Sequence, residues 1–240
     1  MKRLICIVLC LLVLAAAFSA SAAGQNNESG GKLPVLSGMF VAPELVTGKN
    51  SWDQQDWDSV MSQMKAVGID QVVIQYSVQY YSDIVKNHYY VPGFEQAGTD
   101  NTGKQQQIPF ALKAAKKHGV KIWLGLHIAE DAWFRAMPAG FQDLNFLIDS
   151  AEYSKKIFDD LWSQFKGEYA GTIAGWYLPF EFNNVDVKGE AKTRLINYFY
   201  KPLTQHIKSV TPDKLIMVSP LVYASLTVPP AKQAVDAWKD

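Results

Sequence analysis

Polar side chains stand where long apolar runs of this sequence end, and their types suit proton-transfer chemistry. Glu181 follows the run 173–180, whereas His127 and Gln75 lie near the ends of two other runs. A carboxyl, an imidazole and an amide can donate, accept and orient protons on a neutral polar substrate when they converge on one site. These residue types therefore indicate general acid–base chemistry.

Five near-continuous apolar runs, each bounded by turn residues, are the elements that would position these side chains. Such runs are typical of parallel strands that are covered on both faces. They occupy residues 37–43, 71–78, 121–128, 173–180 and 215–222. Amphipathic helical stretches separate the runs, and this alternation predicts a parallel α/β fold.

Local signals mark the ends of some of these helices. Ser51 and Gln54 have the spacing of a capping box before the first helical stripe. Gly119 follows a lysine-rich stretch, which is typical of a helix C-terminus. Pro202 falls inside the last helical stripe, where it predicts a kink or a break.

The alternation of side chains along a strand decides which residues share a face. Along the run 173–180 and its next residue, Tyr177 and Glu181 fall on the smaller and more polar face of the strand. This face would point to the centre of a barrel. The same alternation places His127 on the face of Trp123. Two alternatives stay open, because His127 also fits a buried core histidine and Glu181 a solvated loop acid.

The connections that leave the carboxyl ends of the predicted strands are long. They span roughly residues 79–107, 129–150 and 181–190, whereas such connections usually have about 2–6 residues. Barrels and open α/β sheets both bind their ligands at this edge. The functional face is therefore predicted at the carboxyl ends of the strands.

Aromatic and polar residues near this edge are the candidate substrate-binding groups. Aromatic rings can stack on the apolar C–H faces of sugars, and Trp133 and Tyr223 are the candidates for this contact. Packing of the loops on themselves is the alternative for each aromatic residue. The predicted substrate-binding residues are Gln75, Tyr76, His127, Trp133, Tyr177, Asn183, Tyr223 and Glu44.

The spacing of the strands bears on the architecture. The runs start about 45 residues apart, and a closed (β/α)8 TIM barrel needs eight such units. We expect either a TIM barrel truncated after its fifth βα unit or an open five-stranded parallel sheet. The barrel is favoured because doubly wound sheets usually have phosphate-binding glycines after the first strand, and residues 42–44 contain none.

Residues 1–23 have the pattern of a cleaved signal peptide. Lys2 and Arg3 precede an apolar stretch that is shorter than the ~20 residues of a membrane span. Residues 24–33 are polar and glycine-rich, which predicts a flexible lead-in to a domain at 34–240. We expect a secreted or periplasmic protein that has no membrane association after cleavage.

Composition and motifs exclude several classes of function. Lys and Arg together number 23, as do Asp and Glu, so the basic excess of a nucleic-acid-binding protein is missing. Both cysteines, Cys6 and Cys10, lie in the predicted leader, and the four histidines are dispersed. Phosphate-loop, dinucleotide and serine-hydrolase motifs are absent. The sequence therefore predicts no metal and no cofactor.

The most distinctive stretch is Gly-Trp-Tyr-Leu-Pro-Phe-Glu at residues 175–181. Together with residues 38–40, 68–76 and 122–126, it resembles a family of secreted bacterial proteins of uncharacterised function, which are classed as TIM-barrel, glycoside-hydrolase-like domains. The resemblance implies a (β/α)8 barrel related to retaining glycosidases that act on polysaccharide or oligosaccharide. It also implies that Glu181 occupies the position of the strand-four acid/base.

Two departures from the glycosidase pattern keep a second function open. Phe180 stands where large groups of these enzymes have an asparagine that binds the sugar 2-hydroxyl. A retaining mechanism also needs a second carboxyl about 5–5.5 Å from the first, and only Glu181 is a candidate. The alternatives are a glycoside hydrolase and a non-catalytic glycan-binding barrel. An incomplete barrel with exposed strand edges would instead favour aggregation.

Overall fold

A five-stranded parallel sheet with its helices is the main feature of the structure. The structure is a computed structural model, which describes residues 36–42, 51–81, 84–94, 104–183 and 186–221. In spatial order, the strands of this sheet are β1 (Gly38–Val41), β2 (Gln71–Ile74), β5 (Lys121–Gly125), β7 (Ile173–Leu178) and β8 (Leu215–Val218). Each of the five falls within one of the predicted strands, and all neighbours pair in parallel.

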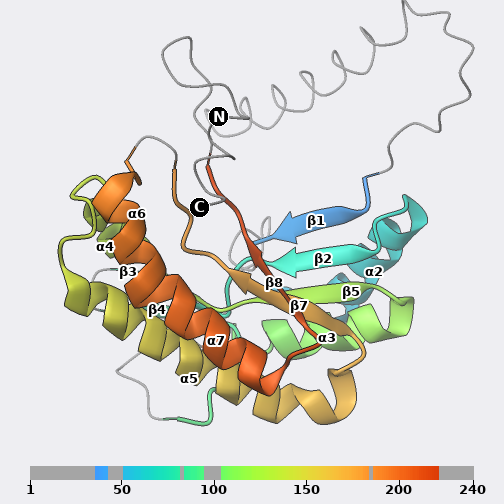
Figure 1. Cartoon of the computed structure of the whole chain (residues 1–240). Coiled ribbons are helices and arrows are strands. Elements are labelled where there is room, and N and C mark those ends of the chain that lie inside the picture. The colour runs from blue at the N-terminus through green and yellow to red at the C-terminus, as the bar shows by residue number, and fades with distance from the viewer. Residues whose placement is uncertain (1–35, 43–50, 82–83, 95–103, 184–185, 222–240) are drawn as a thin grey trace, which may run out of the picture. The chain divides into compact units, whose positions relative to one another are not determined.

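The connecting helices lie on one side of this sheet (Figure 1). They are α2 (Gln54–Ala66), α3 (Gln107–His118), α5 (Leu144–Tyr169) and α7 (Lys201–Val210). Because the strands add one after another in chain order, right-handed crossovers place every helix on the same face. This is the arrangement of a barrel wall, whereas a doubly wound sheet carries helices on both faces. Within the described residues the sheet does not close into a barrel.

A second sheet of three strands extends beyond the carboxyl ends of β2 and β5. It has the order β4 (Ile84–His88), β3 (Val78–Tyr81), β6 (His127–Ala129), with β3 antiparallel to β4 and parallel to β6. The runs 71–78 and 121–128 were predicted to be single strands. The structure corrects this, because each run is broken before it enters the second sheet.

Close backbone packing produces the two breaks. The Ser77 hydroxyl donates to the Gly125 carbonyl at 2.5 Å, and the Ser77 N–H donates to the Leu126 carbonyl at 2.7 Å. A Cβ atom on Gly125 would overlap the Gln75 carbonyl. Glycine is therefore the residue that allows the two chains to approach here.

The helix termini agree with the sequence signals in part. Gly119 ends α3 in the left-handed conformation, with φ of 67°, as predicted. The capping box of α2 differs from the prediction: Asp53 caps the helix and pairs with Asp56, in place of Ser51 and Gln54. A carboxylate and a hydroxyl both accept hydrogen bonds from the free N–H groups of the first helical turn. The residue types alone therefore do not decide between Asp53 and Ser51 as the cap.

The last helical stripe contains the irregularity that Pro202 predicted. The helix runs through α6 (Gly189–Leu195), the π-helical turn η1 (Ile196–Tyr200) and then α7, where Pro202 is at the start. Proline has no N–H to donate to the preceding turn, so the hydrogen-bond pattern widens there.

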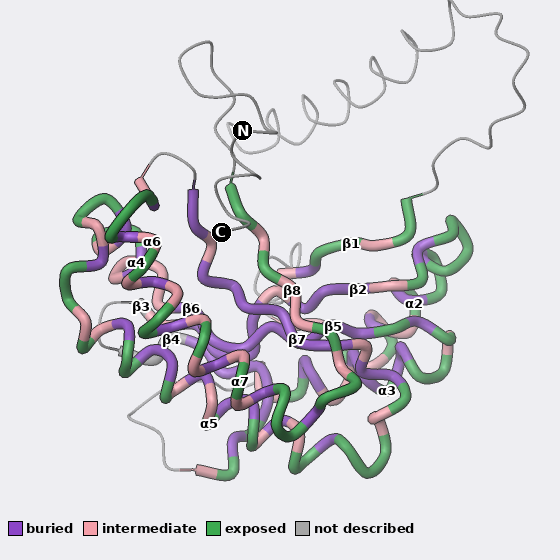
Figure 2. Tube along the Cα trace, in the orientation of Figure 1, coloured by how far each residue is buried: buried purple, intermediate pink, exposed green. Residues whose placement is uncertain are grey.

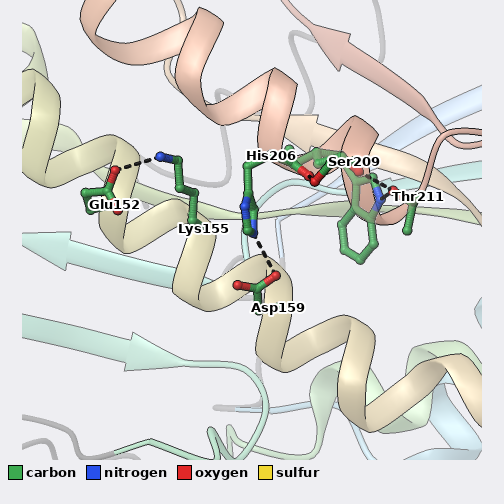
Figure 3. Close-up of polar contacts among 8 residues, drawn as sticks. Glu152, Lys155, Asp159, His206, Ser209 and Thr211 are labelled. Atoms are coloured by element: carbon green, nitrogen blue, oxygen red, sulfur yellow. Dashed lines mark hydrogen bonds and ion pairs between the residues drawn. The ribbon is translucent and has the colours of Figure 1, made fainter.

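Polar contacts join α7 to α5 and the end of α7 to β7. His206 Nε2 on α7 lies 2.8 Å from Asp159 Oδ1 on α5 (Figure 3). The Trp176 indole N–H donates to the Thr211 hydroxyl at 3.1 Å. Thr211 follows α7, so this bond ties the helix end to β7.

The two faces of the sheet are packed differently. The helix side contains the main core, in which Trp57, Phe158 and Trp176 are fully buried, and Figure 2 shows buried residues along the central strands and exposed residues on the outer helices. On the opposite face Val73, Trp123 and Tyr177 form a separate cluster. The predicted face of Trp123 and Tyr177 is therefore confirmed.

The Trp123 ring covers Gly175 on that face, and this contact yields a stability prediction. A Cβ on residue 175 would lie 2.7 Å from the Trp123 ring and would overlap the Leu215 carbonyl. Overpacking of this kind costs about 1–3 kcal/mol. We expect Gly175→Ala to lower the free energy of unfolding by that amount in urea denaturation.

Gly167→Ala is the matched control for this substitution. Gly167 lies within α5 and nothing is within 4 Å of a Cβ placed there. Alanine should therefore raise helix stability by up to about 1 kcal/mol. A Gly175→Ala protein as stable as the wild type would contradict the close packing of β7 on its neighbours.

Candidate active site

Glu181 lies directly beyond the carboxyl end of β7, and its side chain is partly buried. The Tyr177 hydroxyl donates a hydrogen bond to Glu181 Oε1 at 3.4 Å. A side-chain hydrogen bond also links Tyr177 to Ser219, which follows β8. The structure thus brings together a carboxyl, a phenol and a hydroxyl at the carboxyl edge of two neighbouring strands.

Burial decides the electrostatics of this pair. Loss of solvent raises the pKa of Glu181, and the hydrogen bond from Tyr177 partly opposes that rise because it favours the carboxylate. Burial, followed by the nearby charge of Glu181, raises the pKa of Tyr177 above its ordinary value. Tyr177 therefore remains a neutral donor, and Glu181 holds its proton to a higher pH than a solvated glutamate does. This is the property required of a general acid.

The backbone around Glu181 is held by side chains from distant helices. The Trp133 indole N–H, from α4 (Glu130–Ala136), donates to the Glu181 carbonyl. The Tyr200 hydroxyl, at the end of η1, donates to the Phe180 carbonyl. Tyr200 was not among the sequence candidates, because a tyrosine next to Phe199 in a helical stretch gives no sign of this contact.

The structure corrects the predicted role of Trp133 as a platform for a sugar ring. Its side chain has 0% exposure and packs against Phe141, Phe180 and Phe199 with ring-centroid distances of 4.8, 4.6 and 5.7 Å. The connection that was expected to be a loop folds into α4 and buries the indole. The open alternative, loop packing, is the arrangement observed.

His127 does not lie on the face of Trp123, so that expectation is wrong. Its ring packs on Phe180 and Tyr153 at 4.9 and 5.0 Å, and Nδ1 lies 2.9 Å from the Ser154 hydroxyl on α5. The break at Leu126 changes the alternation, so the imidazole turns to the helix side. Burial lowers the pKa of His127 to about 3. The alternative of a core histidine fits this position.

The remaining predicted residues are dispersed. Gln75 is partly buried just beyond β2. Tyr76 is buried against Tyr89, with ring centroids 5.7 Å apart. Asn183 is also buried, and its side chain hydrogen-bonds the backbone and the carboxylate of Asp186, which closes a turn. The buried side chains of Tyr76 and Asn183 contribute to structure and do not present a surface to a ligand, whereas Gln75 is partly exposed.

Some predictions fall on residues that the structure does not describe. Glu44 and Tyr223 lie outside the described residues, as do the predicted leader 1–23 and the lead-in 24–33. Within the part that is described, no group of three or more His, Asp, Glu or Cys side chains could hold a metal ion. No helix among these residues is long and apolar enough to span a bilayer.

The neutral, buried state of His127 predicts an acid-dependent loss of stability. The unfolded chain binds a proton below the ordinary histidine pKa of about 6.5, whereas the folded chain does not bind one until about pH 3. Stability is therefore lost as the pH falls from about 6.5, by up to roughly 1.4 kcal/mol per pH unit. Urea denaturation between these pH values measures the slope.

A double variant isolates this contribution. His127→Phe with Ser154→Ala removes the imidazole and its hydroxyl partner while it keeps an aromatic ring in the core. We expect the double variant to have a shallower dependence of unfolding free energy on pH. Equal slopes in the two proteins would show that His127 does not remain neutral in the folded chain.

Comparison with solved structures finds a similar fold in a putative fucosidase and in a mannanase. A putative α-L-fucosidase from Bacteroides thetaiotaomicron VPI-5482 gives a TM-score of 0.60 at 18% identity, with 90% of this chain and 63% of that chain covered. An endo-1,4-β-mannanase from Rhizomucor miehei gives 0.53 at 16% identity, with 87% and 63% covered. This chain therefore spans less than two thirds of either structure. At such identities the similarity shows the fold, a parallel α/β sheet of the TIM-barrel type, and no more.

Sequence comparison identifies the family. No curated protein matches the chain. A family model described as a domain of unknown function, DUF4434, matches residues 36–239. Because this match spans most of the sequence, the chain belongs to the DUF4434 family.

Proposed function

We propose that this protein is a glycoside-hydrolase-like enzyme that acts on a polysaccharide or oligosaccharide, with Glu181 as its general acid/base. The observation that carries the proposal is the partly buried Glu181 at the carboxyl end of β7, with a raised pKa and a hydrogen bond from Tyr177. This is the edge at which barrel enzymes place catalytic groups. The fold shared with a putative fucosidase and a mannanase supports the same class of substrate.

Each residue of the site has a defined part in this chemistry. Glu181 donates a proton to the glycosidic oxygen as its bond to the anomeric carbon breaks. The resulting carboxylate then takes a proton from the water whose oxygen bonds to that carbon. Tyr177 holds the carboxyl in place through its hydroxyl. Trp133 and Tyr200 are positioning residues, because they bond the backbone on either side of the carboxyl group. Gln75 supplies an amide to a sugar hydroxyl at the same edge.

The proposal includes export of the protein. Residues 1–23 have the charged start, apolar centre and small-residue end of a signal peptide. Cleavage there releases a secreted or periplasmic bacterial protein, which can reach polymers outside the cytoplasm.

A non-catalytic glycan-binding protein is the second candidate. The groups that shift the pKa of Glu181 are its burial and Tyr177, and no second carboxylate among the described residues is one of them. Phe180, at the position of the sugar-binding asparagine of many glycosidases, is buried on the helix side. Both observations favour binding without turnover.

Replacement of the proposed proton donor separates the two candidates. Glu181→Gln keeps the size of the side chain and removes its acid, so we expect release of reducing ends to fall by about 10²–10⁴-fold. The assay uses mannan, β-glucan and fucosylated polysaccharides, with binding to the same panel measured in parallel. Glu190→Gln, on the exposed surface of α6, is the matched control.

The outcomes of this experiment are distinct. Full activity in Glu181→Gln would refute the assignment of the acid. Binding to the panel by the wild type, with no reducing ends released, would instead support the glycan-binding candidate. A normal thermal transition in both variants shows that the folds are comparable.

The Tyr177 hydroxyl predicts a shift in pH dependence. A general acid works while it is protonated, so activity is lost as the pH rises through its pKa. Tyr177→Phe removes a hydrogen bond that lowers the pKa of Glu181, so the alkaline limb of activity should move to higher pH. Titration of a ¹³C-labelled Glu181 carboxyl reports the same shift without a substrate.

Tyr198→Phe provides the control, because Tyr198 is exposed on η1. The control should leave both the activity limb and the carboxyl titration unchanged. If Tyr177→Phe left the Glu181 titration in place, or moved it to lower pH, the hydrogen bond between these side chains would not have the role assigned here.

A further inference from the structure

A cavity of about 300 Å³ lies on the helix side of the second sheet. This volume is at the lower end of the range found for small-molecule sites. Its lining comes from β3, β6, α4 and α5. The lining residues are Tyr80, His127, Ala129, Ala132, Phe146, Asp149, Ser150 and Tyr153.

The cavity is separate from the site at Glu181. Phe180 and Glu181 are neighbours, but the Phe180 ring contacts His127 in the cavity wall. The Glu181 carboxyl instead meets Tyr177, which belongs to the cluster on the opposite face of the sheet. The segment after β7 thus separates two different environments.

His127 lines the cavity, and one of its two ring nitrogens has no hydrogen-bond partner among the described residues. The Ser154 hydroxyl has one hydrogen-bond partner among the described residues, which is Nδ1 of His127 at 2.9 Å. When the hydroxyl donates to Nδ1, the proton of the neutral imidazole is on Nε2. No described group hydrogen-bonds Nε2, although the side chain is only 2% exposed. With this tautomer, the His127 Nε2–H is a donor from which no described group accepts, on a residue that lines the cavity.

The rest of the lining restricts the chemistry of a ligand. Asp149 contributes a carboxylate, and no Lys or Arg lines the cavity, which disfavours anions. Tyr80 and Tyr153 pack edge to face at 5.1 Å and share a hydrogen bond between their hydroxyls. With Phe146 they are the aromatic residues of the lining, here called the aromatic wall, and Ala129 and Ala132 add small apolar side chains.

We propose that this cavity binds one neutral sugar ring. The Nε2–H of His127 donates to a ring hydroxyl oxygen, and Asp149 accepts from other hydroxyls. The aromatic wall contacts the apolar C–H face of the ring. This inference goes beyond the function proposed for Glu181, because the ligand is held at a second site where no bond is made or broken.

Monosaccharide binding to the full chain tests the proposal. The probes are D-glucose, D-mannose and L-fucose, titrated by NMR into the Glu181→Gln protein with the His127 side-chain nitrogens observed. We expect at least one sugar to bind with a Kd of roughly 1 mM and to shift the Nε2 signal. Because no hydrolysis is involved, this result does not depend on whether Glu181 is an acid catalyst.

Variants locate the bound sugar. Asp149 is exposed on α5, and Asp149→Ala should weaken binding about 10-fold through loss of hydrogen bonds to a charged acceptor. Ala132→Leu fills the cavity and should abolish binding. Glu152→Ala is the matched control, since Glu152 is a carboxylate on the same helix that pairs with Lys155 outside the cavity (Figure 3).

Three results would overturn the proposal. The first is the absence of an Nε2 shift with all three sugars. The second is binding that persists unchanged in both Asp149→Ala and Ala132→Leu. The third is tighter binding of tetramethylammonium than of any sugar, which would identify the cavity as a site for organic cations. Reducing-end release by the wild type tests Glu181 independently of these results.

Discussion

The position of Glu181 depends on two hydrogen bonds to consecutive carbonyl groups beyond β7. The chain leaves the ladder of the sheet there, and a buried carbonyl without a donor would destabilise the fold. Trp133 supplies a donor to one carbonyl and Tyr200 to the other. Both donors are large side chains that themselves need a partner when they are buried. Each carbonyl needs a donor and each donor needs an acceptor, so these hydrogen bonds hold the helices and the end of the strand in one arrangement.

Aromatic packing strengthens this arrangement around Phe180. Its ring contacts those of Trp133 at 4.6 Å and Phe199 at 4.8 Å. Phe199 and Tyr200 are adjacent in the π-helical turn, and both reach the same residue: one through its ring and the other through its hydroxyl. π-helical turns are often found at functional sites. Here the π-helical turn, next to Pro202, makes two contacts with the segment that carries the Glu181 carboxyl.

Phe180 and Glu181 are consecutive residues, but their side chains lie in two different environments. Phe180 points into the helix-side core, where it touches the neutral His127. Glu181 points to the other face, where partial burial favours its protonated form and the hydrogen bond from Tyr177 partly opposes this effect. The Phe180 side chain thus serves the core and is not available on the face of Glu181.

The sequence by itself determined the five strands, the termination of α3 at Gly119 and the common face of Tyr177 and Glu181. These features depend on local patterns of apolar residues, on glycine conformation and on the alternation along β7 towards Glu181. Tertiary structure decided the orientation of His127 and the burial of Trp133. Ser77 and Gly125 join two chain segments that are far apart in sequence, and their contact interrupts the alternation before His127. The indole is buried by helices that pack on it from several parts of the chain. A local sequence pattern does not predict such contacts, because they form only when distant segments of the chain pack together in the core.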